Sequence, residues 1–298
     1  FDMYEKMLNL KLDHLKDAGI GATWLSPIMK SPMADFGYDI SDFYDIDPTF
    51  GNMADFDALM VKAKSLGIKI IMDLVPNHSS DQCKWFLNSI NKTDGKDDYY
   101  IWQDPVFVSV FRGSAWEYNP IRKQYYLHQF TKQQPDLNYR NPAVVTEMQN
   151  VIKFWLEKGI GGFRIDAINH QFEIDRVNKT FPDEPRNPEN NDKDDYGYVD
   201  HIYTKDLDET YWAVYDWRTI FDSYSEKLND TRLMDICINL SFPILKLDQI
   251  SKYLFLSVCM IIQFSNILLT FLHIIITSMK AKHYNLRKFV FHLQNHDD

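Results

Sequence analysis

The chain has 298 residues, of which 45% are hydrophobic and 15% aromatic, and its formal net charge at pH 7 is −10. This composition excludes an intrinsically disordered chain, and the length allows one large domain or two smaller ones. The acidic balance argues against a nucleic-acid partner. The three cysteines, Cys83, Cys237 and Cys259, have neither the spacing of a metal site nor that of a disulfide framework.

The first part of the chain alternates helical and strand-like patterns. Residues 4–18 carry apolar side chains at helical spacing, and residues 22–28 form a short apolar run that predicts a strand. A second helix is predicted at 53–66 and a second strand at 68–75, with a glycine between them that ends the helix. Helices and strands that alternate in this way are typical of parallel β/α units.

The alternation stops after the second strand and resumes later. Residues 79–142 are rich in aromatic side chains and prolines and are too long for a plain loop, so they predict an inserted subdomain. A helix at 143–158 and a strand at 160–166 then restore the pattern. Residues 178–208 form an acidic, solvated loop ahead of a helix at 209–227.

Polar side chains follow the predicted strands at their carboxyl ends, where parallel barrel enzymes build their active sites. Asp73 and His78 follow one strand, and Arg164 and Asp166 lie at the end of another. Residues two apart in a strand share a face, and a guanidinium within about 4–6 Å lowers a carboxylate pKa by roughly 1–3 units. Asp166 is thus expected to be an ionised nucleophile, although an isolated Arg-x-Asp pair is more commonly a structural ion pair.

Four short motifs carry a resemblance to a known family. Asp-Leu-Val-Pro-Asn-His at 73–78, Gly-Phe-Arg-Ile-Asp at 162–166 and Asn-His-Asp at 295–297 resemble signature regions of glycoside hydrolase family 13. Gln-Pro-Asp-Leu-Asn at 134–138 resembles the further signature of its oligosaccharide-cleaving branch. The amino-acid sequence of residues 8–234 is similar to that of insect maltases, which are α-glucosidases. The resemblance implies an α/β fold, an incomplete (β/α)8 TIM barrel with a subdomain inserted after the third barrel strand.

The resemblance also implies roles for individual residues. Asp166 matches the nucleophile, Arg164 its charge partner and Asp297 the carboxylate that stabilises the transition state. The implied contacts with the non-reducing-end glucose are Asp35, Tyr38, Asp73, His78, Phe130 and His296. The expected reaction is hydrolysis of terminal α-1,4-glucosidic bonds with retention, on a disaccharide or oligosaccharide. No cofactor or metal is expected, because the loop that resembles a Ca²⁺ site in some relatives would precede Lys6, outside this sequence.

The resemblance fails at the fifth barrel strand. The family places its acid/base glutamate there, but residues 231–234 are followed by Asp235, and no glutamate occurs after Glu226. Residues 235–291 resemble nothing in the family and are expected to pack poorly. They predict either a segment that joins two separate fragments of a family sequence or a membrane helix, since residues 253–279 carry no charged side chain.

The expected organisation has five parts. They are the start of the catalytic barrel at 1–78, an inserted subdomain at 79–142, the barrel continuation at 143–234, the unrelated apolar segment at 235–291 and a remnant of the seventh-strand motif at 292–298.

Two alternatives to an active α-glucosidase stay open at this stage. A non-catalytic, glucosidase-like heavy chain of an amino-acid transporter would account for the apolar segment and the missing glutamate. A sugar-binding pseudoenzyme would retain the glucose pocket without turnover. Glycosylation motifs begin at Asn77, Asn91, Asn178, Asn229 and Asn239. They predict a secreted or extracellular glycoprotein, with membrane association through 253–279 as the other option.

Overall fold

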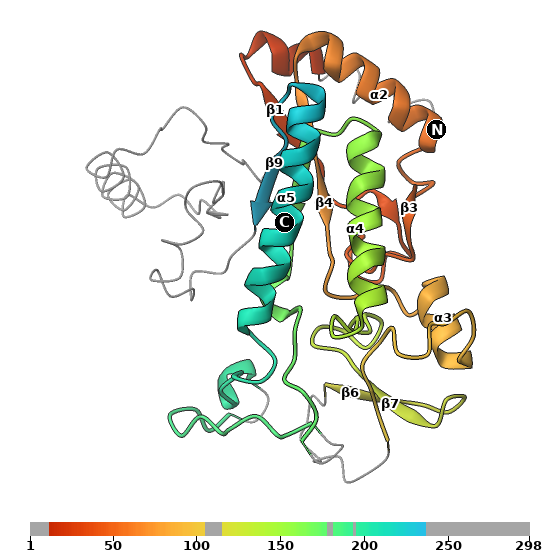
Figure 1. Cartoon of the computed structure of the whole chain (residues 1–298), viewed down its shortest axis with the longest axis vertical. Coiled ribbons are helices and arrows are strands. Elements are labelled where there is room, and N and C mark those ends of the chain that lie inside the picture. The colour runs from red at the N-terminus through yellow and green to blue at the C-terminus, as the bar shows by residue number, and fades with distance from the viewer. Residues whose placement is uncertain (1–11, 105–114, 178–180, 193–194, 237–298) are drawn as a thin grey trace. The chain divides into compact units, whose positions relative to one another are not determined.

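The computed structural model describes residues 12–104, 115–177, 181–192 and 195–236 (Figure 1). The chain divides into two compact units, residues 1–234 and 235–298, and the elements below belong to the first unit apart from the last two residues of its final strand. The predicted apolar segment and the 292–298 remnant lie outside the described residues, except for residues 235 and 236. No helix within the described ranges is long and apolar enough to cross a membrane.

The centre of the first unit is a sheet with the strand order β1-β4-β8-β9. These strands are β1 (Ala22–Trp24), β4 (Lys69–Leu74), β8 (Gly162–Ile165) and β9 (Leu233–Ile236). The pairs β1–β4 and β4–β8 are parallel, which confirms the predicted neighbours. Five of the six residues of β4 are buried, as expected for a strand covered on both faces. Within the described residues the sheet is open, so it forms part of a barrel wall.

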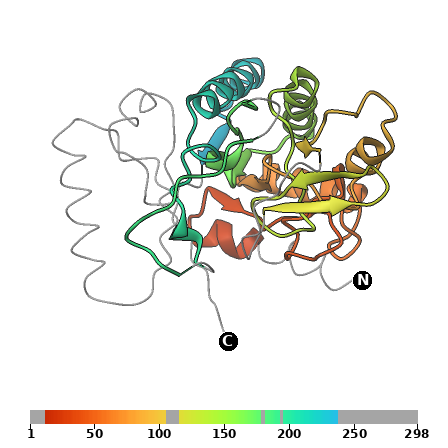
Figure 2. The same cartoon turned by 90° about the horizontal axis from the view of Figure 1, so that it is seen from below.

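Three long helices connect the strands. They are α2 (Met53–Leu66), α4 (Pro142–Glu157) and α5 (Asp208–Leu228), within one residue of the predicted bounds at each end. Asn52 and Asp55 form a reciprocal capping box at the start of α2, and Gly67 ends the helix in the left-handed region with φ of 70°. Figures 1 and 2 both show α4 and α5 side by side along the same side of the sheet.

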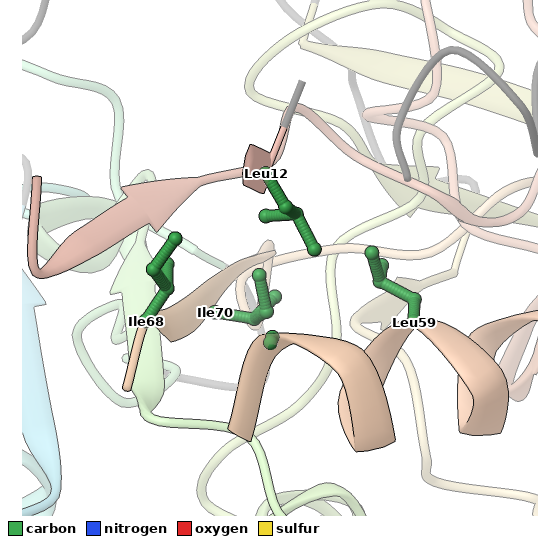
Figure 3. Close-up of a cluster of buried hydrophobic side chains, with 5 residues drawn as sticks. Leu12, Leu59, Ile68 and Ile70 are labelled. Carbon is green, nitrogen blue, oxygen red and sulfur yellow. The ribbon is translucent and has the colours of Figure 1, made fainter. Parts of the chain in front are cut away.

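A cluster of buried aliphatic side chains joins the first helix to the sheet. Residues 12–17, the described part of the predicted 4–18 helix, supply Leu12. Leu59 comes from α2, Ile70 comes from β4, and Ile68 lies directly before that strand (Figure 3). Burial of each such side chain contributes roughly 1.5–3 kcal/mol. This cluster packs the first helix and α2 against the amino end of β4.

The region predicted as an insert has its own small sheet. It contains α3 (Lys84–Asn91) and the antiparallel strands β5 (Trp102–Gln103), β6 (Trp116–Asn119) and β7 (Gln124–Leu127), in the order β5-β7-β6. Its core is aromatic, with Phe86 stacked on Trp102 and packed edge-on against Tyr126. Figure 1 shows β6 and β7 beyond the end of β4 from which the chain enters this region.

The structure corrects the predicted strand at 22–28. Only Ala22–Trp24 belongs to the central sheet, and Pro27, which has no N–H to donate, interrupts the run. The following residues form a separate antiparallel pair that the sequence did not predict, β2 (Met29–Lys30) with β3 (Asp42–Ile46). The loop between β2 and β3 holds two of the predicted sugar contacts.

Gly162 is the closest point of contact between β8 and β9. The Leu233 amide donates to the Gly161 carbonyl at 2.8 Å, and a Cβ atom on Gly162 would overlap the Leu233 backbone. Gly162→Ala is therefore expected to lower the free energy of unfolding by about 3 kcal/mol or more, because neither backbone can move aside. Urea unfolding of the wild-type chain and of Gly162→Ala measures this difference in free energy. Gly21→Ala is the control, since nothing lies within 4 Å of its Cβ position, and equal effects of the two substitutions would contradict the prediction.

Candidate active site

Arg164 lies between two carboxylates at the carboxyl ends of β4 and β8. Asp73 and Arg164 are register partners in these parallel strands, and Nη1 of the arginine is 2.6 Å from Asp73 Oδ2. Nη2 of the same guanidinium is 3.5 Å from Asp166 Oδ1. The predicted Arg164–Asp166 pair therefore exists. Its shorter contact, however, is with Asp73, which the sequence analysis did not pair with it.

The carboxylate of Asp73 is bonded on one oxygen only. Oδ2 accepts from Arg164, from Trp24 Nε1 at 3.2 Å and from Tyr38 Oη at 3.4 Å. Oδ1 is buried and has no hydrogen-bond partner among the described residues. Burial raises the pKa of Asp73 to about 7, although the Arg164 guanidinium opposes the shift. The Asp73 side chain thus presents one unpaired acceptor at the sheet edge.

His78 presents a second unpaired atom. Its Nδ1 lies 3.2 Å from the Asn77 side-chain amide, and its buried Nε2 has no hydrogen-bond partner among the described residues. Burial lowers the pKa of His78 to about 3, although the Tyr38 backbone opposes this shift. The imidazole is therefore neutral. With Nδ1 accepting from Asn77, the proton lies on Nε2, which is then a donor. The Phe130 ring is 5.0 Å from the imidazole and 43% exposed.

A buried aspartate shapes the loop that carries Asp35 and Tyr38. Asp39 accepts hydrogen bonds from the Ser31 hydroxyl and from the backbone amides of Ala34 and Asp35, at 2.9 to 3.0 Å. The Tyr38 hydroxyl then reaches both Asp73 and Arg164. The loop conformation is therefore held by its own side chains, so the two predicted sugar contacts need little reorganisation.

The Gln-Pro-Asp-Leu-Asn motif connects the inserted region to this edge. Gln134 donates to Asp35 Oδ2 at 2.8 Å, and the Leu137 amide donates to the Asn77 carbonyl at 3.0 Å. Asp136 accepts from the Asn77 side chain at 3.3 Å. The motif was noticed as a family signature, and these contacts give it a physical role in positioning residues around His78.

A pair of buried acids lies beside the motif. The Gln129 Nε2 atom is 2.9 Å from each of Asp136 Oδ2, Glu173 Oε1 and the His170 carbonyl. The two acids thus share one amide donor, and Asp136 also accepts from the Asn77 side chain. Burial raises the pKa of Asp136 to about 8 and also raises the pKa of Glu173.

The structure thus brings most of the predicted residues together in two groups. Contacts join Tyr38 to the Asp73–Arg164–Asp166 group, and ring packing joins His78 to Phe130. His296 and Asp297 lie outside the described residues. Within the described ranges, no group of three or more His, Cys, Asp or Glu side chains could hold a metal ion.

Several contributing residues were missed by the sequence analysis. They are Trp24, Asp39, Gln129, His170 and Glu173. The one available signal was local, because Asp39 follows directly after Tyr38 in the same loop. The others act through partners far away in the sequence, and no local pattern marks them.

Comparison with known proteins decides the family. The model of the α-amylase catalytic domain matches residues 8–254. The chain belongs to this family. The match extends beyond residue 234, into the segment that the sequence analysis set apart.

Insect proteins are among the relatives that are similar to this chain. Maltase A2 of Drosophila melanogaster is 50% identical over 243 residues, which are 77% of this chain and 43% of that protein. The salivary α-glucosidase of Anopheles gambiae is 50% identical over 242 residues, 77% of this chain and 41% of that protein. The chain therefore spans less than half the length of these relatives. They give no support to the alternative of a transporter heavy chain.

Solved structures of the family share the fold. The α-glucosyl transfer enzyme XgtA superposes with a TM-score of 0.77 at 33% identity, covering 92% of this chain and 53% of that one. Trehalose-6-phosphate hydrolase of Bacillus licheniformis gives 0.66 at 35% identity, covering 79% and 40%. The described sheet is accordingly part of the wall of a (β/α)8 barrel that these residues do not close.

The buried acid pair predicts an unusual dependence of stability on pH. Asp136 has a pKa of about 8 in the folded chain and about 4 when unfolded. Between these values the folded state holds a proton that the unfolded state has lost. The contribution of this proton to the free energy of unfolding is complete below pH 4 and is lost as the pH rises towards 8. Asp136→Asn should make the free energy of unfolding fall less steeply with rising pH. The slope should change by at most about 1.4 kcal/mol per pH unit.

Urea unfolding at pH 5, 6, 7 and 8 measures the decline. The exposed Asp200 provides a matched control, and Asp200→Asn should leave the slope of the wild-type chain unchanged. If Asp136→Asn follows the wild-type slope across this range, the buried carboxyl does not hold its proton.

Proposed function

We propose that this chain contributes the glucose-binding half of an α-glucosidase active site. The proposed enzyme hydrolyses terminal α-1,4-glucosidic bonds of disaccharides or oligosaccharides with retention, and Asp166 is its nucleophile. Relatives named maltase and α-glucosidase support this proposal, although the chain spans only part of their length. Retaining hydrolysis needs a carboxylate nucleophile beside a sugar that is held in place.

One observation carries the proposal. Among the described residues, Asp73 Oδ1 and His78 Nε2 are buried polar atoms without hydrogen-bond partners. Asp73 lies in β4 and His78 follows that strand, whereas Asp166 follows the neighbouring strand β8. Burying an unpaired polar atom costs roughly 1–3 kcal/mol, so such atoms are conspicuous in a well-packed core. An acceptor and a donor in this position suit the hydroxyl groups of a sugar, which both donate and accept. The exposed part of Phe130 adds an apolar surface for the ring.

Catalysis at this site requires two groups. The Asp166 carboxylate, which is 29% exposed and held by Arg164, would attack the anomeric carbon and form a glucosyl ester. The leaving oxygen needs a proton from a second carboxylic acid, which typically contributes about 10²–10⁴-fold to the rate. The sequence has no glutamate after Glu226, so the glutamate that supplies this proton in the family has no counterpart at the fifth strand. The mechanism involves acids and bases only, and we propose no cofactor.

The missing glutamate also favours a second candidate, a sugar-binding pseudoenzyme. Both candidates require the same pocket, and only turnover separates them. We also propose that the protein is secreted, on the basis of relatives described as salivary. The membrane option rests on residues 253–279 alone, which lie outside the described residues.

An activated substrate tests the nucleophile without the acid. 4-Nitrophenyl α-glucoside has a leaving group that needs no proton, so the chain should release a burst of nitrophenolate and become glucosylated on Asp166. Maltose should turn over about 10²–10⁴-fold more slowly than with a full-length relative. Asp166→Asn should abolish the burst, and mass spectrometry of the trapped chain should locate the glucosyl group.

Each departure from this pattern has a definite meaning. A normal maltase rate would show that another group supplies the proton. Binding of glucose without a burst would favour the pseudoenzyme. Failure to bind glucose, in a folded chain, would overturn the proposed function.

Secretion predicts which glycosylation motifs are used. Asn91 and Asn229 are exposed at the ends of α3 and α5, and Thr93 and Thr231 complete their motifs. The Asn77 amide is buried against Asp136, so a glycan there is incompatible with the fold. The chain secreted from insect cells should carry glycans at the two exposed sites, and Asn91→Gln and Asn229→Gln should each remove one.

Peptide mapping after glycosidase treatment reads out each site separately, and the Asn77 peptide is the internal control. A glycan on Asn77 in the folded, secreted chain would contradict the described packing. Unmodified Asn91 and Asn229 in that chain would contradict the prediction.

A further inference from the structure

Trp24 contacts both members of the central ion pair. It is the last residue of β1, next to β4 in the sheet. Its indole N–H donates to Asp73 Oδ2 at 3.2 Å, and the Arg164 guanidinium lies over its ring, 5.0 Å from the ring centroid. One rigid side chain from a third strand therefore touches the carboxylate and the cation at once.

The contact with Asp73 controls the orientation of the carboxylate. A carboxylate turns easily about its last single bond, and its two oxygens are chemically equal until the surroundings distinguish them. Three donors converge on Oδ2. The Tyr38 hydroxyl is the most distant of them at 3.4 Å, and the guanidinium of Arg164 is shared with Asp166. The indole N–H comes from a residue of the short strand β1 and donates to Oδ2.

The burial of Trp24 also differs from that of tryptophans that serve packing alone. Trp155 and Trp217 are fully buried in the core, whereas Trp24 is only half-buried and directs its polar edge at a buried acid. A hydrogen bond to a charged group typically contributes about 1.5–3 kcal/mol, more than a neutral one. The arrangement is that of a residue whose role depends on its N–H group.

We propose that Trp24 is a positioning residue for the sugar site. Its indole N–H holds Asp73 with Oδ1 facing the sugar, and its ring holds the Arg164 guanidinium within reach of Asp166. This inference rests on the proposed function, because it assumes that Asp73 Oδ1 receives a sugar hydroxyl.

The proposal has a pH signature. The charged or titratable groups that face Asp73 are Arg164 and Asp166 from β8 and Tyr38 from the β2–β3 loop. Trp24, from β1, is neutral and cannot titrate, but its N–H favours the ionised form of Asp73. Removing that N–H raises the pKa of Asp73 further, so binding that needs the carboxylate moves to higher pH.

The experiment compares two tryptophan-to-phenylalanine substitutions in the full chain. Trp24→Phe keeps an aromatic ring against Arg164 and loses the N–H. Trp102→Phe is the matched control, because Trp102 also donates an indole N–H, to Ser89 at 2.9 Å, but in the aromatic core of the insert. Glucose binding is measured by calorimetry from pH 5.5 to 8.5.

Trp24→Phe should weaken glucose binding by about 10-fold at pH 7 and move the midpoint of its pH dependence upwards. Trp102→Phe should leave both quantities as in the wild-type chain. Equal behaviour of the two variants would overturn the role of Trp24 while leaving the proposed function intact. A wild-type chain that binds no glucose would instead overturn the proposed function.

A measurement on the wild-type chain covers the case in which Trp24→Phe does not fold. In ¹⁵N-labelled protein, the Trp24 indole N–H resonance should follow the titration of Asp73 and shift when glucose is added. The Trp102 indole resonance should do neither. A Trp24 signal that ignores both pH and glucose would overturn the proposal without any substitution.

Discussion

The buried ion pair between Asp73 and Arg164 is the interaction on which the site depends. Taking two charges out of water costs several kcal/mol per ion, and the cost is recovered only if the geometry is close and the remaining polar atoms are bonded. The pair meets the first condition because the two residues are register partners on adjacent parallel strands. Trp24 and Tyr38 complete the hydrogen bonds on one side of it. Oδ1 of Asp73 has no hydrogen-bond partner among the described residues, and in the proposed function it receives a sugar hydroxyl.

The second constraint is the attachment of the insert to the end of β4. The segment after β4 and the segment after β7 exchange backbone hydrogen bonds, and side chains of the Gln-Pro-Asp-Leu-Asn motif bond to Asp35 and Asn77. His78, just before the insert, and Phe130, within it, are thereby held against each other, with their ring centroids 5.0 Å apart. The candidate site is thus formed by two parts of the structure, the edge of the central sheet and the insert.

The sequence predicted the central architecture because apolar runs and helical periodicity are local properties. The helix at 53–66 and the parallel pairing of β1, β4 and β8 follow from such patterns. It missed the β2–β3 pair, since those short strands have no alternating pattern and Pro27 interrupts the first run. Arg164 and Asp166 were visible as a motif, but the preference of Arg164 for Asp73 depends on strand register. Register is a tertiary property, and so are the Gln129 and Trp24 contacts.

The separation of Asp73 and Arg164 along the chain, 91 residues, has a consequence for synthesis. A nascent chain that has emerged only as far as the insert contains Asp73 without its cation, so the carboxylate must stay hydrated and β4 cannot yet be enclosed. Closing a loop of this length costs only slightly more entropy than closing one half as long, because the cost grows with the logarithm of length. Contacts so distant in sequence nevertheless form slowly. The insert, whose contacts are local, has time to fold first and to bring the two strands within reach of each other.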